Sequence, residues 1–248
     1  MNILVCISNV PDTTSKINFV KNDTEFDTNG VQFIINPNDE FGLTRAIWLQ
    51  QKQGAEVTVL TVGGVSCEPI LRKCLAIGAN KAIRIDASAT DGFFVAEQIS
   101  EICKTENYNL IITGRESIDY NGGMVPGIIA GILDFNYISN CIQLNIEGDN
   151  VTAAREIDGG KEIISTSLPI VIGAQKGLVE EKDLIIPNMR GIMQARKKPL
   201  TVLQALNIEP KSKTIGFKKP SPKGAVKLVA AENIDELINL LHNEAKVI

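Results

Sequence analysis

Leu110-Ile-Ile-Thr-Gly114 is followed by Arg115-Glu-Ser-Ile-Asp-Tyr-Asn-Gly-Gly123 and then by apolar residues of helical spacing over residues 124–133. A strand-length apolar run, a polar loop with glycines and a helix form the unit in which α/β proteins bind anionic ligands. The first N–H groups of such a helix have no internal partner, and its dipole is positive at that end. The stretch therefore predicts a strand that leads into a candidate phosphate site, although many such units bind nothing.

Strand-like and helix-like segments alternate through the first half of the chain. Apolar runs of strand length are found at residues 2–7, 56–62, 81–85 and 109–114. The helical patterns between them have as expected N-caps Asn38 or Asp39, Ser66, and Asp91. This order predicts a parallel, right-handed α/β sheet whose ligands bind at the carboxyl ends of the strands. Loops at residues 8–12, 63–66 and 114–123 would converge there.

Two other regions carry short-turn patterns. Residues 13–33 are polar, with a small hairpin expected around Asn29-Gly30. After Asp134, short strands and turns predict an antiparallel meander. The expected elements are strands at 141–146, 151–155 and 162–166, a buried strand at 168–173, an exposed loop at 175–188, a helix at 189–195 and a further short turn at 200–206.

The carboxyl-terminal segment predicts an arm. Residues 207–223 are rich in Lys, Pro and Ser and lack the apolar side chains needed to fold alone. Residues 233–245 have apolar positions at helical spacing. We expect an α/β domain over residues 1–206 and an arm over 207–248 that packs on its own domain or on a partner.

Composition excludes several function classes. The net charge of -4 and the pI near 5.2 argue against nucleic-acid binding. No apolar run approaches the ~18 residues of a membrane span, and the amino terminus reads as a first strand, so we expect a cytoplasmic protein without membrane insertion. The five cysteines are scattered and predict buried thiols. With His242 as the only histidine, a Ser-His-Asp site or a histidine-rich metal site is not expected.

Several motifs carry a family resemblance. Arg155-Glu-Ile-Asp-Gly-Gly160 precedes Leu168-Pro169, and Met189-Arg-Gly-Ile-Met-Gln-Ala-Arg-Lys-Lys-Pro199 follows. Shorter matches are Asn36-Pro37, Ala76-Ile-Gly-Ala79 and Ser117-Ile-Asp119. In this order and over nearly the whole chain, they resemble the β subunit of electron transfer flavoproteins.

The resemblance implies a noncatalytic subunit of the adenine-nucleotide α-hydrolase-like (Rossmann-like) fold class. It implies a heterodimer with an α subunit that holds the redox-active FAD. This heterodimer takes electrons from flavin dehydrogenases such as acyl-CoA dehydrogenase. In the commonest members the β subunit holds AMP. In a flavin-bifurcating branch, a second FAD occupies the same position and takes hydride from NADH.

Carried over by position, the family's nucleotide contacts fall on four segments. They are Cys6; Asn36, Pro37, Asn38 and Asp39; Val62; and Asp119, Tyr120, Asn121, Gly122, Gly123, Met124, Val125, Pro126, Gly127, Ile128, Ile129 and Ala130. Asp119 is expected near adenine or ribose, and the N–H groups of residues 121–125 near phosphate. Many relatives have a glutamine at the junction where this chain has Met124-Val-Pro-Gly127, so AMP and FAD both stay open.

The family also has a dehydrogenase recognition loop, which corresponds to about residues 175–198. Its expected contact residues are Ile185, Ile186, Pro187, Asn188, Met189 and Arg190. Met189 stands where relatives have an anchoring leucine, and a thioether can fill an apolar pocket. Leu184-Ile-Ile186 replaces the usual Pro-Arg-Tyr, which leaves the identity of the partner open, and a loop folded back on its own domain is the alternative. Arg155 and the glycines after Asp158 are expected to serve the subunit contact or the meander turn.

Two other function classes compete with this interpretation. A stand-alone adenine-nucleotide module, similar to universal stress proteins, explains the α/β half but gives residues 141–248 no role. An ATP pyrophosphatase or nucleotidylyltransferase would need a Ser-Gly-Gly-x-Asp or His-x-Gly-His motif after the first strand, where Ser8-Asn-Val-Pro-Asp12 stands.

Overall fold

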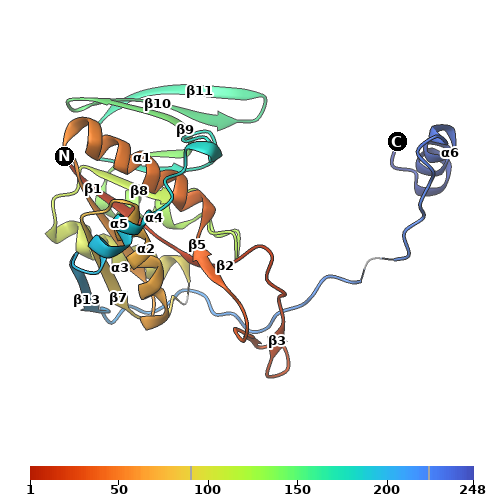
Figure 1. Cartoon of the computed structure of the whole chain (residues 1–248), viewed down its shortest axis with the longest axis horizontal. Coiled ribbons are helices and arrows are strands. Elements are labelled where there is room, and N and C mark those ends of the chain that lie inside the picture. Colours follow the sequence, from red (N-terminus) through yellow and green to blue (C-terminus); the bar gives the residue numbers. More distant parts are fainter. Residues whose placement is uncertain (90, 223) are drawn as a thin grey trace.

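A computed structural model describes residues 1–89, 91–222 and 224–248. A nine-stranded sheet in the order β11-β10-β9-β12-β8-β1-β6-β7-β13 forms its centre (Figure 1). The strands of this sheet are β1 (Asn2–Cys6), β6 (Glu56–Val62), β7 (Lys81–Asp86), β8 (Leu110–Gly114), β9 (Asn136–Glu147), β10 (Asn150–Ile157), β11 (Gly160–Ser167), β12 (Ile170–Ala174) and β13 (Leu200–Gln204). Neighbours are parallel from β9 to β13, whereas β9, β10 and β11 form an antiparallel meander. The predicted Rossmann-like class is confirmed.

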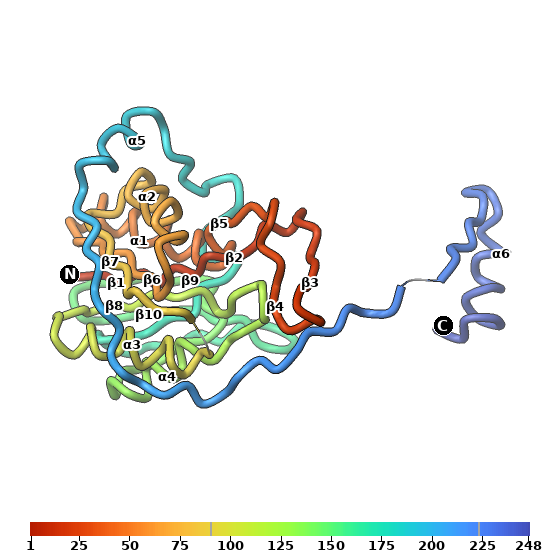
Figure 2. Tube along the Cα trace, turned by 90° about the horizontal axis from the view of Figure 1, so that it is seen from below, coloured from red at the N-terminus to blue at the C-terminus, as the bar shows by residue number. Residues whose placement is uncertain are grey.

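Helices cover both faces of the sheet. They are α1 (Pro37–Gln53), α2 (Glu68–Ile77), α3 (Gly92–Thr105), α4 (Val125–Leu133) and α5 (Met189–Ala195), whereas α6 (Ile234–Asn239) lies in the arm and covers neither face. One apolar core lies under α1 and α2, and a second lies under α3 and α4 (Figure 2). The central strands are buried on both faces, which explains why their sequences are continuously apolar instead of alternating.

Several predicted elements agree with the structure. β6 has the predicted bounds, and α5 covers the predicted residues 189–195. Asp91 caps α3, because its carboxylate accepts a hydrogen bond of 2.7 Å from the Phe94 N–H. In the meander, Gly159 has φ +79° at the turn between β10 and β11, the conformation for which glycine was expected.

The amino-terminal loops differ from the prediction. β2 (Asn9–Pro11) pairs with β5 (Phe33–Ile35), so the residues predicted as a plain loop form a small separate sheet. Pro11 is tolerated because it ends a short edge strand. The predicted hairpin at residues 29–30 is wrong: β3 (Phe19–Val20) pairs with β4 (Glu25–Phe26) instead. Three residues of the connecting turn, 21–23, have positive φ, which a local pattern did not reveal.

Two predicted N-caps are wrong. The N-cap of α1 is Asn36, and Pro37 occupies the first turn, where its missing N–H has no internal partner. A 3₁₀ turn (Val65–Cys67) precedes α2, so Cys67 and not Ser66 is the N-cap. Neither cap residue accepts a helix N–H with its side chain. The Asn36 side chain instead hydrogen-bonds to Asp39, Glu116 and Ile118, and α2 continues directly from the 3₁₀ turn.

Two predictions for the region after the meander are also wrong. Residues 200–206 form no turn, because β13 extends along β7 at the edge of the sheet. Its exposed, partly polar pattern lacks the signal of a buried strand. Within the expected exposed loop 175–188, Leu178 and Val179 are buried, and Ile185 packs against the core.

The arm leaves the body after β13. In both views α6, continued by a π-helical segment (Leu240–Ala245), stands clear of the body (Figures 1 and 2). Its apolar residues Ile234, Leu237 and Ile238 are exposed. Among the described residues, none of the helices has the length and apolar composition needed to cross a bilayer.

Candidate functional site

The candidate site lies at the carboxyl ends of neighbouring strands, where β8 and β6 flank β1. The chain runs from β1 outward through β6 and β7 and then returns to β8 on the other side of β1, so the topological switch point lies between β1 and β8. Cys6 is the buried last residue of β1 and pairs in register with Leu60. Val62 therefore lies two residues beyond that pair, at the same edge. Ligands of open α/β sheets bind at this position.

Asp39 connects three chain segments at the switch point. One carboxylate oxygen accepts the Ser8 N–H at 2.7 Å, and the other accepts the Gly114 N–H at 2.7 Å and the Asn36 side-chain amide at 3.0 Å. Burial raises the pKa of this carboxyl to about 7, although these hydrogen bonds act in the opposite direction. We call Asp39, Asn36 and the N–H groups of Ser8 and Gly114 the Asp39 clamp.

Asn36 and Asn38 hold the loop that follows β8. Both side-chain amides donate to the Glu116 carbonyl, at 2.9 and 3.2 Å. The Asn36 side-chain carbonyl oxygen accepts the Ile118 N–H at 3.2 Å. Asn36 is fully buried, and both the nitrogen and the oxygen of its side-chain amide are bonded within the chain. The side chains of Asn36 and Asn38 therefore fix the position of the loop that follows β8.

The start of α4 presents free backbone donors. Among the described residues, the N–H groups of Gly123, Met124 and Val125 have no hydrogen-bond acceptor. Asn121, with φ 49°, turns the chain into this segment. The Met124 side chain lies where a Cβ on Gly92 would be, 2.6 Å from its Cγ, so it packs on the start of α3. Three consecutive donors at a helix start suit an anionic group.

The remaining predicted contacts differ in accessibility. Asp119 and Tyr120 are exposed, and the Asp119 carboxylate accepts the Tyr120 N–H. Within α4, Pro126, Ile129 and Ala130 are buried, and both Ile129 and Ala130 belong to the core under α3 and α4. The predicted contacts that are partly buried are Pro37, Asn38, Gly122, Val125, Gly127 and Ile128. Ligand contact is thus easiest for the loop and the first turn of α4.

Sequence reasoning expected the loops at residues 8–12 and 63–66 at this edge, but it did not single out two contributors. Ser8 acts through its N–H, which has no side-chain signature. Arg84 is buried in β7 and donates to the Gly63 carbonyl at 3.0 Å, which supports the glycine loop after β6. An arginine between Ile83 and Ile85, in a partly buried strand, was the available signal for Arg84.

Gly114→Ala is expected to destabilise the protein by about 2–4 kcal/mol. An added Cβ would lie 2.3 Å from the Asp39 Oδ1 and 2.8 Å from the Asn36 Nδ2, so the clamp must shift. Urea unfolding measures the change. Gly131→Ala is the matched control, because a Cβ there meets nothing within 4 Å and alanine favours a helix. Equal unfolding midpoints for the two variants would contradict the role of the clamp.

A second surface surrounds α5, which is fixed on α2. The Arg72 guanidinium donates to the Ala195 and Lys198 carbonyls, each at 2.9 Å, and the Lys198 ammonium donates to three carbonyls at the end of α2. Asn188 caps α5 by accepting the Gly191 N–H at 2.8 Å. These hydrogen bonds therefore fix α5 in place on α2.

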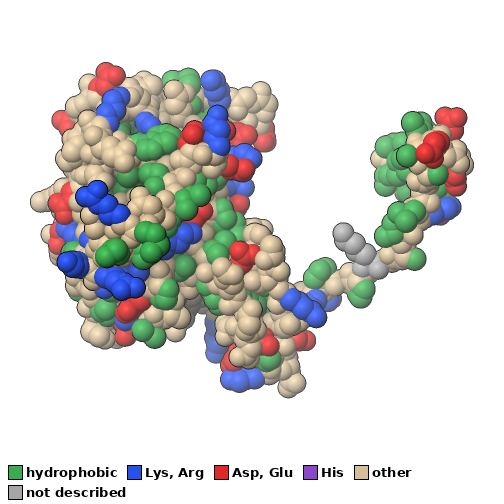
Figure 3. Space-filling view, viewed as in Figure 1, with side chains coloured by type: hydrophobic (Ala, Val, Ile, Leu, Met, Phe, Trp, Pro, Cys, Tyr) green, Lys and Arg blue, Asp and Glu red, His purple; other side chains and the backbone are tan. Residues whose placement is uncertain are grey.

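Apolar side chains on α5 and just before it face solvent. Ile186, Met189 and Met193 are 84%, 74% and 67% exposed, whereas Ile185 packs inward. In Figure 3, apolar side chains over the α5 region lie beside Lys and Arg side chains. A groove of about 550 Å³ between α2 and α5 adjoins them, lined by Pro69, Arg72, Lys73, Ala76, Pro187, Ile192, Ala195 and Arg196. The predicted alternative of a loop folded back on its domain holds for Leu178, Val179 and Ile185, but not for Ile186, Met189 and Met193.

The chain is similar in sequence to known proteins of one family. The family model of the electron transfer flavoprotein domain matches residues 23–207. The electron transfer flavoprotein subunit beta of Bacillus subtilis is 36% identical over 262 residues, which cover 100% of both chains. This chain belongs to the electron transfer flavoprotein beta-subunit family. The Syntrophomonas wolfei subunit beta is 34% identical over 91% of this chain and 88% of its own, and the Bos taurus subunit beta is 28% identical over 100% and 99%.

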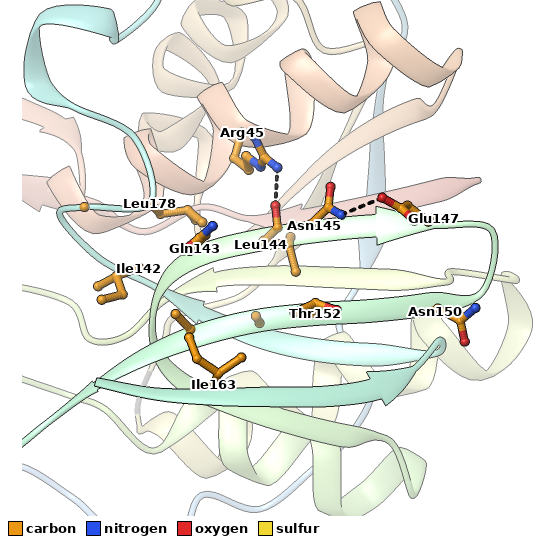
Figure 4. Close-up of a pocket in the computed structure, with 13 residues that line it drawn as sticks. Arg45, Ile142, Gln143, Leu144, Asn145, Glu147, Asn150, Thr152, Ile163 and Leu178 are labelled. Carbon is orange, nitrogen blue, oxygen red and sulfur yellow. Dashed lines mark hydrogen bonds between the residues drawn. The ribbon is translucent and has the colours of Figure 1, made fainter. Parts of the chain in front are cut away.

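A groove elsewhere on this family member is not part of the site. It has a volume of about 760 Å³ and lies between α1 and the meander (Figure 4). The Arg45 side chain points from α1 toward β9 and donates to the Leu144 carbonyl. None of the predicted nucleotide contacts lines this groove.

Proposed function

We propose that this chain is the nucleotide-binding, noncatalytic subunit of an electron transfer flavoprotein heterodimer. The observation that carries the proposal is the switch point between β1 and β8, where Asn36, Asn38 and Asp39 join the end of β1 to the loop that leads to α4. The first N–H groups of α4 have no acceptor among the described residues. Full-length similarity to proteins named subunit beta supports it.

AMP is the nucleotide that we assign to this site. Its phosphate would lie on the N–H groups of residues 123–125, and its adenosine near Asp119 and the end of β1. The donor set fits, because these groups are unpaired within the described chain and no Lys or Arg is required. The Asp39 clamp fixes the β1 and β8 loops against each other, which favours binding because the loops are ordered beforehand.

The redox chemistry belongs to FAD held mainly by an alpha subunit, and this chain supplies position and contact surfaces. The exposed residues of α5 would contact a flavin dehydrogenase of the acyl-CoA dehydrogenase type, with Met189 as the anchor. The exposed apolar face of α6 would pack on the alpha subunit. In this role the chain carries out no turnover alone.

Two alternative functions differ from this proposal. In a bifurcating heterodimer a second FAD would take the AMP position and be reduced by NADH. As a stand-alone nucleotide module, the chain would have no use for the exposed Met189 and Met193 or for the apolar face of α6.

Co-expression with an alpha subunit tests the proposal. We expect a stable one-to-one heterodimer, and no turnover by the purified chain alone. A chain that purifies as a soluble monomer and does not bind the alpha subunit would refute the proposed function.

A further inference from the structure

The first part of the arm is anchored to the body at successive points. Gln98, buried in α3, pairs with both the N–H and the carbonyl of Leu206. Further along, the Asp91 carboxylate accepts the N–H groups of Lys211 and Ser212, each at 2.6 Å. The Lys211 ammonium lies 5.1 Å from the centre of the Phe93 ring.

The next anchor is the β3–β4 hairpin. The rings of Phe19 and Phe217 stack with centroids 4.6 Å apart and planes 7° apart. The Phe217 N–H donates to the Asp23 carbonyl at 2.7 Å, and the Lys219 ammonium donates to the Asn18 side chain at 3.0 Å. Both views show the arm passing beside this hairpin before it leaves the body (Figures 1 and 2).

Burial distinguishes this contact from a chance crossing of two exposed segments. Among residues 209–222, Phe217 is the one side chain that is not exposed. Its neighbour Ile215 is 89% exposed. The body residues involved lie far away in sequence, on a polar amino-terminal segment that has no other role in the core described above.

We propose that Asp91, Asn18, Phe19 and Asp23 form an arm bracket, a surface that receives residues 211–219 and directs the terminal helix toward the alpha subunit. This inference rests on the proposed function. The bracket orders these residues before assembly, so that heterodimer formation does not require ordering them. It also shortens the free chain that precedes α6 from roughly 28 residues to roughly 15, which raises the local concentration of α6 at its binding site.

Hydrogen exchange on the full chain, without a partner, tests the bracket itself. Phe217→Ala and Phe19→Ala should each accelerate exchange of the amides in residues 211–219 about tenfold or more. Ile215→Ala is the matched control and should leave exchange unchanged, because its side chain is solvated. Unchanged exchange in both phenylalanine variants would overturn the proposal.

Affinity for the alpha subunit tests the consequence. Each phenylalanine variant should raise the Kd about tenfold, and the double variant should be no weaker than either single variant, because both remove one contact. If Phe217→Ala weakened binding while Phe19→Ala did not, Phe217 would contact the alpha subunit directly and the bracket would be refuted. If the wild-type chain did not bind, the proposed function would fail, whereas the exchange result would still decide whether the bracket exists.

Discussion

Raising the pH from about 4 to about 7 is expected to lower the free energy of unfolding of the wild-type chain, relative to that of Asp39→Asn, by on the order of 4 kcal/mol. The folded-state pKa of Asp39 is about 7, above the ordinary value of 3.8. Between these values the unfolded chain releases the proton and the folded chain keeps it. The contribution of Asp39 to the free energy of unfolding is therefore largest below pH 3.8. It falls as the pH rises to about 7 and does not change further above that pH.

Chemical denaturation at a series of pH values measures this difference. Burial raises the pKa values of the neighbouring Cys6 and Cys74 thiols well above this range, so neither thiol ionises within it. Asp39→Asn replaces one carboxyl oxygen by an amide nitrogen, which cannot accept a hydrogen bond, although both Asp39 oxygens accept in the clamp. This variant is therefore expected to be less stable than the protonated wild type at low pH, and only the pH dependence of the difference is compared. Glu40→Gln controls for the loss of a carboxylate at the start of α1. A constant gap between wild type and Asp39→Asn across the range would show that Asp39 does not titrate there.

Met189→Ala is expected to slow electron transfer from the donor dehydrogenase about 10- to 100-fold, the effect of losing an interface anchor. The side chain is 74% exposed on a helix that Arg72 and Lys198 hold in place, so the truncation removes contact area without disturbing the core. The measured quantity is the second-order rate of flavin reduction in the heterodimer.

Met193→Ala is the matched control, because it removes the same side chain one turn later, at 67% exposure. It should change the rate less than about threefold, and nucleotide content should be unchanged in both variants. Equal losses for the two methionines would assign the contact to the whole apolar surface instead of to Met189.

Local patterns predicted the elements whose signals are local. β6 is rich in Val and Leu because it is buried on both faces after Glu56, and Asp91 precedes α3 as a typical N-cap. By contrast, Asp39 was expected to cap α1 or to contact the nucleotide. Its structural partners Ser8 and Gly114 lie 31 and 75 residues away in the chain, and no local pattern reports such contacts.

The elements that were missed depend on partners from elsewhere in the chain. β13 is an exposed edge strand that exists because β7 offers an open edge. The β3–β4 hairpin has few apolar residues of its own, and Phe217 from the arm stacks on it. For the site, the strand ends followed from the alternating order of elements, whereas the roles of Asn36 and Arg84 required the tertiary structure.

The nucleotide content of the purified heterodimer tests the central claim most directly. Denaturation followed by separation and quantification of the released nucleotides should give one FAD and one AMP per heterodimer, and Gly114→Ala should lower the AMP content while leaving one FAD. Two FAD per heterodimer, with flavin reduction by NADH, would contradict the assignment of AMP. One FAD with no second adenine nucleotide would contradict a nucleotide site between β1 and β8.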